Sequence, residues 1–271
     1  MKPEAGRMQS TGPMAWSPLG AQVLTLPCGG HELFYLSPLS RTTLNTAPAR
    51  GGVPVLFPQF ADRGPLKKHG WARDMVWTVV QERSTDSSAG RWVQQLNLSQ
   101  TERPEWPHAA RLTLSAHVQP HCFEMSLTVE NTGGSAFAWT GGLHPYWATD
   151  DLLATELHGL SGAKVQDRYQ PERAVEGNRP VRWTGAECER LYDTAAPVLL
   201  KTPSHTIELS MTGFDQWMVW NPGQQGAVAL ADLPDGDWQR FVCIEPVLVC
   251  RPSRLEPGQT FEGSFRVQVT A

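Results

Sequence analysis

The chain has 271 residues and a formal net charge of −4, so no overall basic field favours binding to nucleic acid. Charged residues make up only 18 % of the chain while tryptophan occurs 11 times, a composition that excludes an intrinsically disordered protein. Five scattered cysteines without a CxxC pair are typical neither of a disulfide framework nor of a structural zinc site, so we expect reduced thiols in a cytoplasmic protein.

The first 20 residues, MKPEAGRMQSTGPMAWSPLG, contain no long apolar segment. We interpret residues 1–20 as a flexible segment and residues 21–271 as a single domain, because all-β sandwiches commonly reach roughly 200–250 residues as one unit. No run anywhere in the chain approaches the roughly 20 apolar residues of a membrane span, so we expect no membrane partner.

A stretch rich in glycine, proline and cations follows at residues 50–73, RGGVPVLFPQFADRGPLKKHGWAR. Arginine offers an oxyanion two hydrogen bonds from one planar group and lysine adds a point charge, so Arg50, Lys68 and Arg73 predict an anion site, with His69 among them. Glycines permit a close approach of the backbone and prolines stiffen the loop. The alternative is that Arg50 and Arg73 make only surface ion pairs.

Alternation of apolar and polar residues dominates the rest of the chain. Residues 111–118 (RLTLSAHV) and 123–130 (FEMSLTVE) each place apolar side chains on one face, which predicts an antiparallel hairpin. Residues 206–211 and 264–270 repeat the pattern, turn sequences such as ENTGG and LPDGD recur, and no segment keeps a helical period over three turns. The pattern predicts an all-β fold, a large antiparallel β-sandwich with few short helices.

The segment TGGLHPYW at residues 140–147 holds His144 between a glycine pair and a proline, with aromatic residues directly after it. A constrained loop histidine can donate a proton near neutral pH. A histidine beside aromatic residues can equally be a packing or capping residue, and this segment alone leaves the choice open.

The nearly continuous apolar run at residues 240–249, RFVCIEPVLV, contains Glu245. Burial of an unpaired carboxylate costs several kcal/mol, and it raises the pKa of the group unless cations or hydrogen bonds favour the charged form. Glu245 is therefore a candidate acid or base. The alternative is that it lies on the exposed face of an edge strand.

Six motifs, in order from about residue 30 to the C-terminus, carry a resemblance to a known family. They are RGGVPVLFPQF with HGWAR, GGLHPYW, WTGAECERLYDT, FDQWMVWNPG, FVCIEPVLV and LEPGQTFEG. The sequence resembles the aldose 1-epimerase (galactose mutarotase-like) superfamily and, within it, the hexose-6-phosphate mutarotases, also called glucose-6-phosphate 1-epimerases. The resemblance implies a β-supersandwich with its site in a cleft on one concave sheet.

The resemblance also implies roles for individual residues. His144 would be the general acid and Glu245 the general base, Arg50 and Arg73 would contact the sugar phosphate, and His69 would line the pocket. The two catalytic groups are then expected on opposite sides of the hemiacetal, where they open the sugar ring and let it close on the other face.

Two positions depart from the pattern of the family. Members often carry glutamine just before the HG pair, where this chain has Lys68. A later segment normally holds an aspartate that binds sugar hydroxyls, and the aligned residue here is Glu189. Lys68 could tighten anion binding and the longer Glu189 could shift the sugar, so both bear on the substrate more than on the reaction.

Proton transfer makes up nearly all of this chemistry, so we expect no cofactor and no metal, in keeping with the absence of a glycine-rich nucleotide loop and of a Cys/His cluster in the sequence. The expected partner is a small sugar phosphate, acted on by a monomer. Two alternatives stay open at this point: a mutarotase of unphosphorylated aldoses, and a non-catalytic carbohydrate-binding protein that kept the fold.

Overall fold

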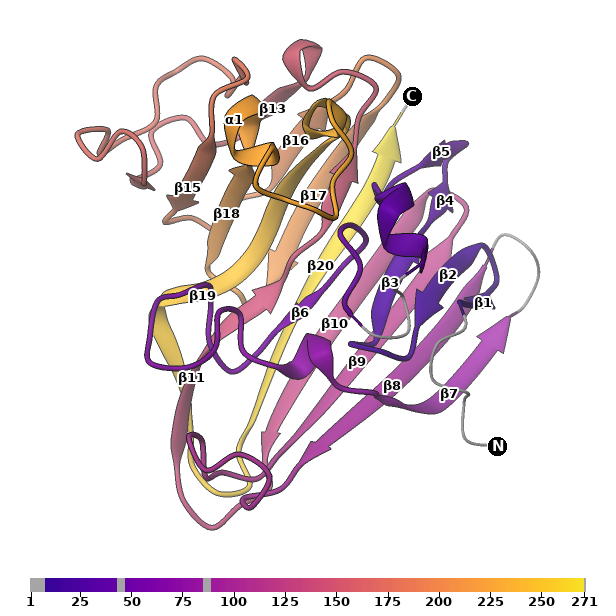
Figure 1. Ribbon diagram of the computed structural model, residues 1–271, viewed down its shortest axis with the longest axis vertical. Helices are drawn as coiled ribbons and strands as arrows, with labels where there is room; N and C mark the ends of the chain where they lie inside the picture. The colour runs from indigo at the N-terminus through magenta and orange to yellow at the C-terminus, as the bar shows by residue number, and fades with distance from the viewer. Residues whose placement is uncertain (1–7, 43–46, 85–88, 271) are drawn as a thin grey trace.

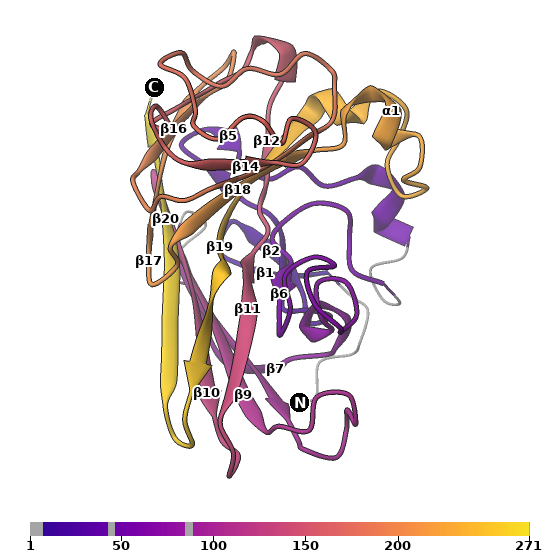
Figure 2. The same cartoon turned by 90° about the vertical axis from the view of Figure 1, so that its left-hand side faces the viewer.

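The computed structural model describes residues 8–42, 47–84 and 89–270. Two large antiparallel sheets make up most of this part of the chain, and they lie against each other (Figures 1 and 2). Within the described residues the helices are one short α-helix and four 3₁₀ turns: α1 (Gly223–Ala227), η1 (Pro38–Thr42), η2 (Ala72–Asp74), η3 (Leu152–Ala154) and η4 (Asp237–Arg240). The predicted large antiparallel sandwich with few short helices is confirmed.

The larger sheet has eight strands. In spatial order they are β13 (Glu156–His158), β16 (Val198–Lys201), β17 (Thr206–Thr212), β20 (Thr260–Thr270), β10 (Cys122–Asn131), β9 (Ala110–Gln119), β8 (Gly90–Leu98) and β7 (Thr78–Ser84). The predicted hairpin is confirmed as β9 and β10, which pair Leu114 with Leu127 and Val118 with Phe123. These four side chains are buried while their neighbours alternate outward, as a strand with one buried face requires.

The second sheet has seven strands. In spatial order they are β14 (Val165–Asp167), β15 (Cys188–Tyr192), β18 (Gln216–Asn221), β19 (Phe241–Leu255), β11 (Phe137–Leu143) and β6 (Val55–Leu56), with β12 (Tyr146–Ala148) also paired to β19. The apolar run predicted around Glu245 forms the first half of β19. This half is buried on both faces, which explains why its sequence does not alternate.

Large aromatic side chains fill the interior. Six tryptophans are less than 2 % exposed and belong to one continuous apolar cluster: Trp16, Trp77, Trp92, Trp139, Trp147 and Trp217. Burial of a large apolar side chain stabilises a fold by about 1.5–3 kcal/mol, so these rings contribute a large share of the apolar burial that holds the sheets together.

The N-terminal segment is more ordered than its sequence indicates. Strands β1 (Gln9–Thr11), β2 (Met14–Ser17) and β3 (Gln22–Thr25) form a small sheet, and β4 (Pro27–Cys28) pairs with β5 (His31–Glu32). Trp16 is buried with its ring 5.4 Å from that of Trp92. The expectation that residues 1–20 are flexible is therefore wrong for residues 9–17, because long-range packing against β8 fixes strands too short to show a pattern. Residues 1–7 lie outside the described part.

Among the described residues, no helix has the length and apolar character that crossing a membrane requires.

Candidate active site

A cavity of about 280 Å³ lies on the seven-stranded sheet, where loops from the first third of the chain cover it. All seven residues singled out in the sequence line this cavity: Arg50, Lys68, His69, Arg73, His144, Glu189 and Glu245. The remaining lining residues are Phe60, Ala61, Asp62, Tyr146, Arg168, Met218, Trp220 and Leu230. The structure thus brings together side chains that are up to 195 positions apart in the sequence, from Arg50 to Glu245.

Strand register explains the floor of the cavity. Glu189 on β15 pairs with Trp220 on β18, which pairs with Cys243 on β19, which in turn pairs with Tyr146 on β12. Paired residues project to the same side of a sheet, so these four form one row. Glu245 lies two residues after Cys243 and therefore projects to this same side.

A glycine two residues before His144 lets the chain pass closely between two strands of this sheet. Gly142 pairs with Leu56 on one side and with Val247 on the other, with φ at 151°. A Cβ atom there would lie 2.2 Å from the Pro246 carbonyl oxygen, so only glycine fits between the strands. The His144 N–H then donates to the Pro54 carbonyl at 3.0 Å, which fixes the backbone of the candidate acid.

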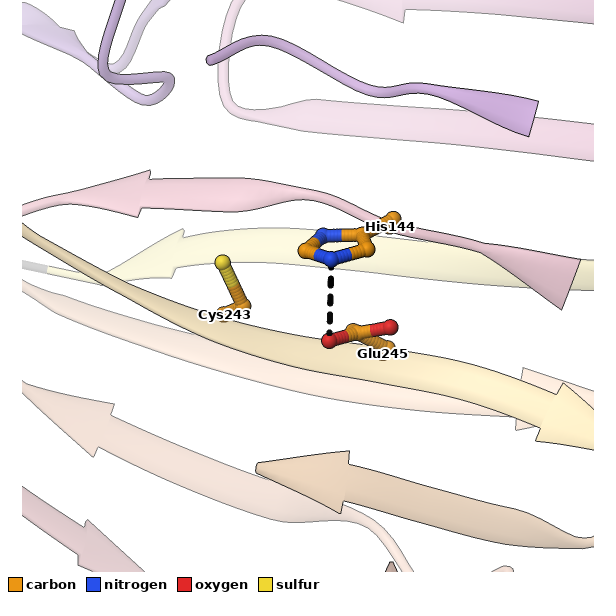
Figure 3. A group of neighbouring side chains, drawn as sticks. All are labelled: His144, Cys243 and Glu245. Carbon is orange, nitrogen blue, oxygen red and sulfur yellow. Dashed lines mark ion pairs between the residues drawn. The ribbon is translucent and has the colours of Figure 1, made fainter. Parts of the chain in front are cut away.

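The His144 imidazole and the Glu245 carboxylate form a buried pair. Nε2 of His144 lies 3.4 Å from Oε1 of Glu245 (Figure 3). No side chain or backbone group of the described residues bonds to Nδ1 of His144 or to Oε2 of Glu245. Glu245 is thus not on an exposed edge, and the alternative of an exposed carboxylate is wrong.

This spacing also revises the expected geometry. At 3.4 Å the two groups are neighbours, so a sugar carbon does not fit between them as the expectation of opposite sides requires. Both groups line one cavity, and from there they can reach two oxygens bonded to the same carbon. The ring oxygen and the anomeric hydroxyl of a hemiacetal are two such oxygens.

Burial sets the protonation of the pair. It lowers the pKa of His144 to about 3, with further lowering by the positive charges of Arg73 and Arg50. Burial raises the pKa of Glu245 well above its usual value, and the charge of Glu189 adds to the effect. Burial therefore favours the uncharged form of both groups, a neutral imidazole and a protonated carboxyl.

Tyr146 holds the imidazole from one side. The two rings are stacked at 4.9 Å between centroids with an interplanar angle of 12°. The Tyr146 hydroxyl accepts a hydrogen bond of 3.1 Å from Nη1 of Arg50. Arg50 also donates from Nε to the Asp232 carboxylate at 3.1 Å, so its charge is compensated within the protein.

Arg73, unlike Arg50, forms no ion pair within the described residues. Within the described residues no carboxylate lies at ion-pair distance from Arg73, and its buried Nε atom has no hydrogen-bond partner. Burial lowers the pKa of Arg73, in line with the cost of a guanidinium removed from water. Lys68, exposed at the rim of the cavity, is likewise outside the ion pairs found in the described part.

His69 is held in an uncommon backbone conformation, with φ at 65°. Its Nδ1 accepts a hydrogen bond from the Ala61 N–H at 3.3 Å, so the neutral ring carries its proton on Nε2. Burial, together with the nearby His144 and Arg73, lowers the pKa of His69 to about 2. A neutral donor therefore lines the cavity at this position.

Glu189 is clamped by two arginines. Arg168 donates to Oε2 at 3.0 Å, and Nη2 of Arg63 lies 3.6 Å from Oε1. Glu189 lines the cavity as expected, yet both of its oxygens are already engaged. This arrangement ties the wall of the cavity to the loop after β14 and to the loop after β6.

Sequence reasoning missed Tyr146, Trp220, Asp62 and Arg168 as lining residues. Tyr146 and Trp220 belong to the quoted motifs GGLHPYW and FDQWMVWNPG, so their place in those motifs was an available signal. Asp62 lies within the quoted stretch 50–73, where the cations drew attention away from it, and Arg168 lies outside every quoted motif. Asp232, the partner of Arg50, is 182 residues away from it along the chain.

Solved structures of other proteins share this fold. A Salmonella typhimurium protein provisionally named a mutarotase superposes with a TM-score of 0.81 at 24 % identity, over 95 % of this chain and 86 % of that chain. A galactose mutarotase-like protein from Lactobacillus casei gives a TM-score of 0.69 at 17 % identity, over 97 % and 99 %. These likenesses show the fold, a β-sandwich shared with mutarotase-like proteins.

Residues 13–268 match the aldose 1-epimerase family, and the chain belongs to this family. A relative from Cenchrus ciliaris is 28 % identical over 248 residues, which cover 86 % of this chain and 74 % of the relative. One from Escherichia coli K12 is 28 % identical over 243 residues, which cover 83 % and 76 %. Both relatives are provisionally named glucose-6-phosphate 1-epimerase. The protein is thus an isomerase that interconverts sugar anomers, and the alternative of a non-catalytic binding protein is set aside.

Proposed function

We propose that this isomerase interconverts the α and β anomers of a hexose 6-phosphate, with glucose 6-phosphate as the first substrate to test. The observation that carries the proposal is Arg73, a guanidinium at the cavity that forms no direct ion pair with a described carboxylate, although Asp74 and Asp232 act on it from a longer distance. A half-buried guanidinium without a direct ion pair is costly, and a sugar phosphate would supply an anion at contact distance. Lys68 at the rim adds a second positive charge, and the names of the curated relatives point to the same substrate.

The proposed chemistry consists of two proton transfers, one at each oxygen bonded to the anomeric carbon of the sugar. Glu245 removes the proton of the anomeric hydroxyl while His144 protonates the ring oxygen. The ring opens, the aldehyde turns about its first carbon–carbon bond, and the ring closes on the other face with both transfers reversed. Each transfer is worth about 10²–10⁴-fold in rate.

Substrate binding prepares the pair for this step. The reaction starts from protonated His144 and ionised Glu245, which hold the same number of protons as the neutral pair. A phosphate at Arg73 and Lys68 offsets two of the charges that lower the pKa of His144. The proton then moves more easily from Glu245 to His144 across their 3.4 Å separation.

The remaining binding roles follow from the same cavity. We assign Arg50 to positioning Tyr146 as well as to the sugar phosphate, His69 to donating a hydrogen bond to a sugar oxygen, and Glu189 to the sugar hydroxyls. The five cysteines are free thiols, which supports the proposed cytoplasmic location. A monomeric state remains a prediction, to be measured by light scattering.

Substitution of Arg73 by alanine tests the phosphate assignment. We expect KM for glucose 6-phosphate to rise by at least about tenfold, because a charge-assisted hydrogen bond contributes roughly 1.5–3 kcal/mol, while KM for free glucose changes little. Anomeric exchange is measured by NMR saturation transfer. Lys67→Ala is the matched control, since Lys67 lies in the loop just before η2 but pairs with Asp74 at 2.5 Å. Equal increases in KM for glucose 6-phosphate and for free glucose would contradict the assignment of Arg73 to the phosphate.

A second candidate, an epimerase of unphosphorylated aldoses, is favoured by one observation. Arg50 is already compensated by Asp232, so only some of the cations expected to bind phosphate are available. Exchange of free glucose or galactose that is faster than exchange of glucose 6-phosphate would establish this alternative.

A further inference from the structure

Cys243 adjoins the catalytic pair, and the proposed reaction gives it no role. It lies on β19 two residues before Glu245, with its side chain on the same face of the sheet. Figure 3 shows its sulfur at one edge of the His144 ring. One donor atom each from His144, Cys243 and Glu245 lies within 4.8 Å of the others.

The three side chains are removed from solvent, and two of them, His144 and Glu245, each keep an atom without a hydrogen-bond partner among the described residues. Their exposed fractions are 6 % for His144, 0 % for Cys243 and 1 % for Glu245. Nδ1 of His144 and Oε2 of Glu245 have no hydrogen-bond partner among the described residues. His144 and Glu245 also line the cavity, which gives a path for a small ion and room for a further ligand.

We propose that these three residues form a binding site for a thiophilic divalent cation such as Zn²⁺, which occupies the site in competition with the sugar. Imidazole, thiolate and carboxylate are the three donor types that Zn²⁺ uses, and a three-ligand site leaves one position open. The 3.4 Å between Nε2 and Oε1 suits two ligands of one ion, and the Cys243 sulfur lies within 4.8 Å of a donor atom of each. Its thiol proton and that of Glu245 pass to the buffer on binding.

The surrounding charges narrow the choice of metal. Arg50, Arg73 and Lys68 all act on His144 with positive charge, and they oppose any cation held only by electrostatic attraction. Mg²⁺ and Ca²⁺ prefer oxygen ligands, of which this set offers one carboxylate, so they are excluded. A cation with strong bonds to sulfur and nitrogen overcomes the repulsion. The site therefore makes the enzyme sensitive to Zn²⁺, and this consequence rests on the proposed roles of His144 and Glu245.

Co²⁺ serves as the probe, because it accepts the same ligands as Zn²⁺ and shows a charge-transfer absorption band when a thiolate such as that of Cys243 binds it. We expect Co²⁺ titration of the full chain under reducing conditions to produce this band, and Zn²⁺ but not Mg²⁺ to displace it. Cys243→Ser and Cys243→Ala should abolish this band and weaken Zn²⁺ binding at least about tenfold. Substitution of a residue that only supports a metal ligand already costs about that much in metal affinity. Cys250→Ser, at an exposed cysteine on the same strand, is the matched control and should keep the band.

The outcomes separate the metal site from the proposed reaction. Absence of the band in wild type, or its survival in both Cys243 variants, overturns the metal site whatever sugar the enzyme uses. For wild type, whichever sugar is turned over should displace Co²⁺, and Zn²⁺ should inhibit its exchange competitively. Absence of exchange of glucose 6-phosphate would contradict the proposed substrate while the cobalt titration still decides the metal site.

Discussion

Glu245 is the residue that we propose as the base of the reaction. Glu245→Gln keeps the shape of the side chain and removes the base, so we expect exchange of glucose 6-phosphate to fall by about 10²–10⁴-fold. NMR saturation transfer measures the loss. Glu124→Gln, on the exposed side of β10, serves as the control. Retention of more than a tenth of the activity by Glu245→Gln would contradict a role as base.

The same substitution should change stability in a pH-dependent way. The pKa of Glu245 is raised in the folded state, so the folded protein holds a proton that the unfolded chain releases. This contribution is complete below the unfolded value of about 4.3 and is lost as pH rises through the folded pKa. We expect Glu245→Gln to raise Tm more at pH 8 than at pH 5, measured by calorimetry. An equal shift at both values would show that the carboxyl ionises without cost.

The folded pKa of His69 is shifted down, whereas that of Glu245 is shifted up, so the contribution of His69 to stability changes with pH in the opposite direction. Its folded pKa of about 2 is below the unfolded value of about 6.5, so acid protonates the unfolded chain first. The stability that this neutral histidine contributes is present above about pH 6.5 and is lost as pH falls toward 2. His69→Asn accommodates the positive φ and should reduce the drop in Tm between pH 7 and pH 5. His117→Asn, at an exposed site on β9, should leave that drop as in wild type.

At the scale of elements, the pairing of β11 with β19 sets the distance between the proposed acid and the proposed base. Gly142→Ala would force a Cβ atom against the Pro246 carbonyl at a φ that other residues rarely adopt. We expect a loss of about 2–4 kcal/mol in the free energy of unfolding and a fall in turnover as His144 moves. Denaturant unfolding and saturation transfer measure the two effects. Gly134→Ala, where a Cβ would meet nothing within 4 Å, should change neither.

The elements that the sequence predicts well are those with a local pattern. The hairpin of β9 and β10 alternates over its full length, and the buried run of β19 stands out by its apolar content. The strands of the N-terminal sheet have three or four residues each, too few for alternation to be distinguished from chance. These strands are ordered because they pack against distant parts of the chain, and a local sequence pattern gives no information about such contacts.

At the scale of the whole molecule, the first described strands complete the core. Trp16 is 1 % exposed, packs on Trp92 and donates from its indole N–H to Thr11 at 3.0 Å. Trp16→Ala should therefore cost about 3–5 kcal/mol of stability, as large core truncations do. Denaturant unfolding measures it. Met8→Ala, at a side chain 53 % exposed, should cost little, and a similarly small loss for Trp16→Ala would show that the N-terminal sheet is dispensable.

The cavity shows where prediction from sequence ends. The candidate acid, base and cations could be named because each lies in a motif with distinctive neighbours. Their partners could not: Asp232 bonds to Arg50 and Arg168 to Glu189 only because the sheet brings distant loops together. The 3.4 Å between His144 and Glu245 likewise follows from strand register, which no single segment encodes.

The eight-stranded sheet supplies none of the residues that line the cavity. Its outer face carries His117, Glu124 and Arg266 side by side on β9, β10 and β20, all exposed. This face is therefore the natural attachment point for practical use of the enzyme. A reactive handle introduced in this row would tether the protein to a bead or an electrode and leave the catalytic pocket open to its sugar.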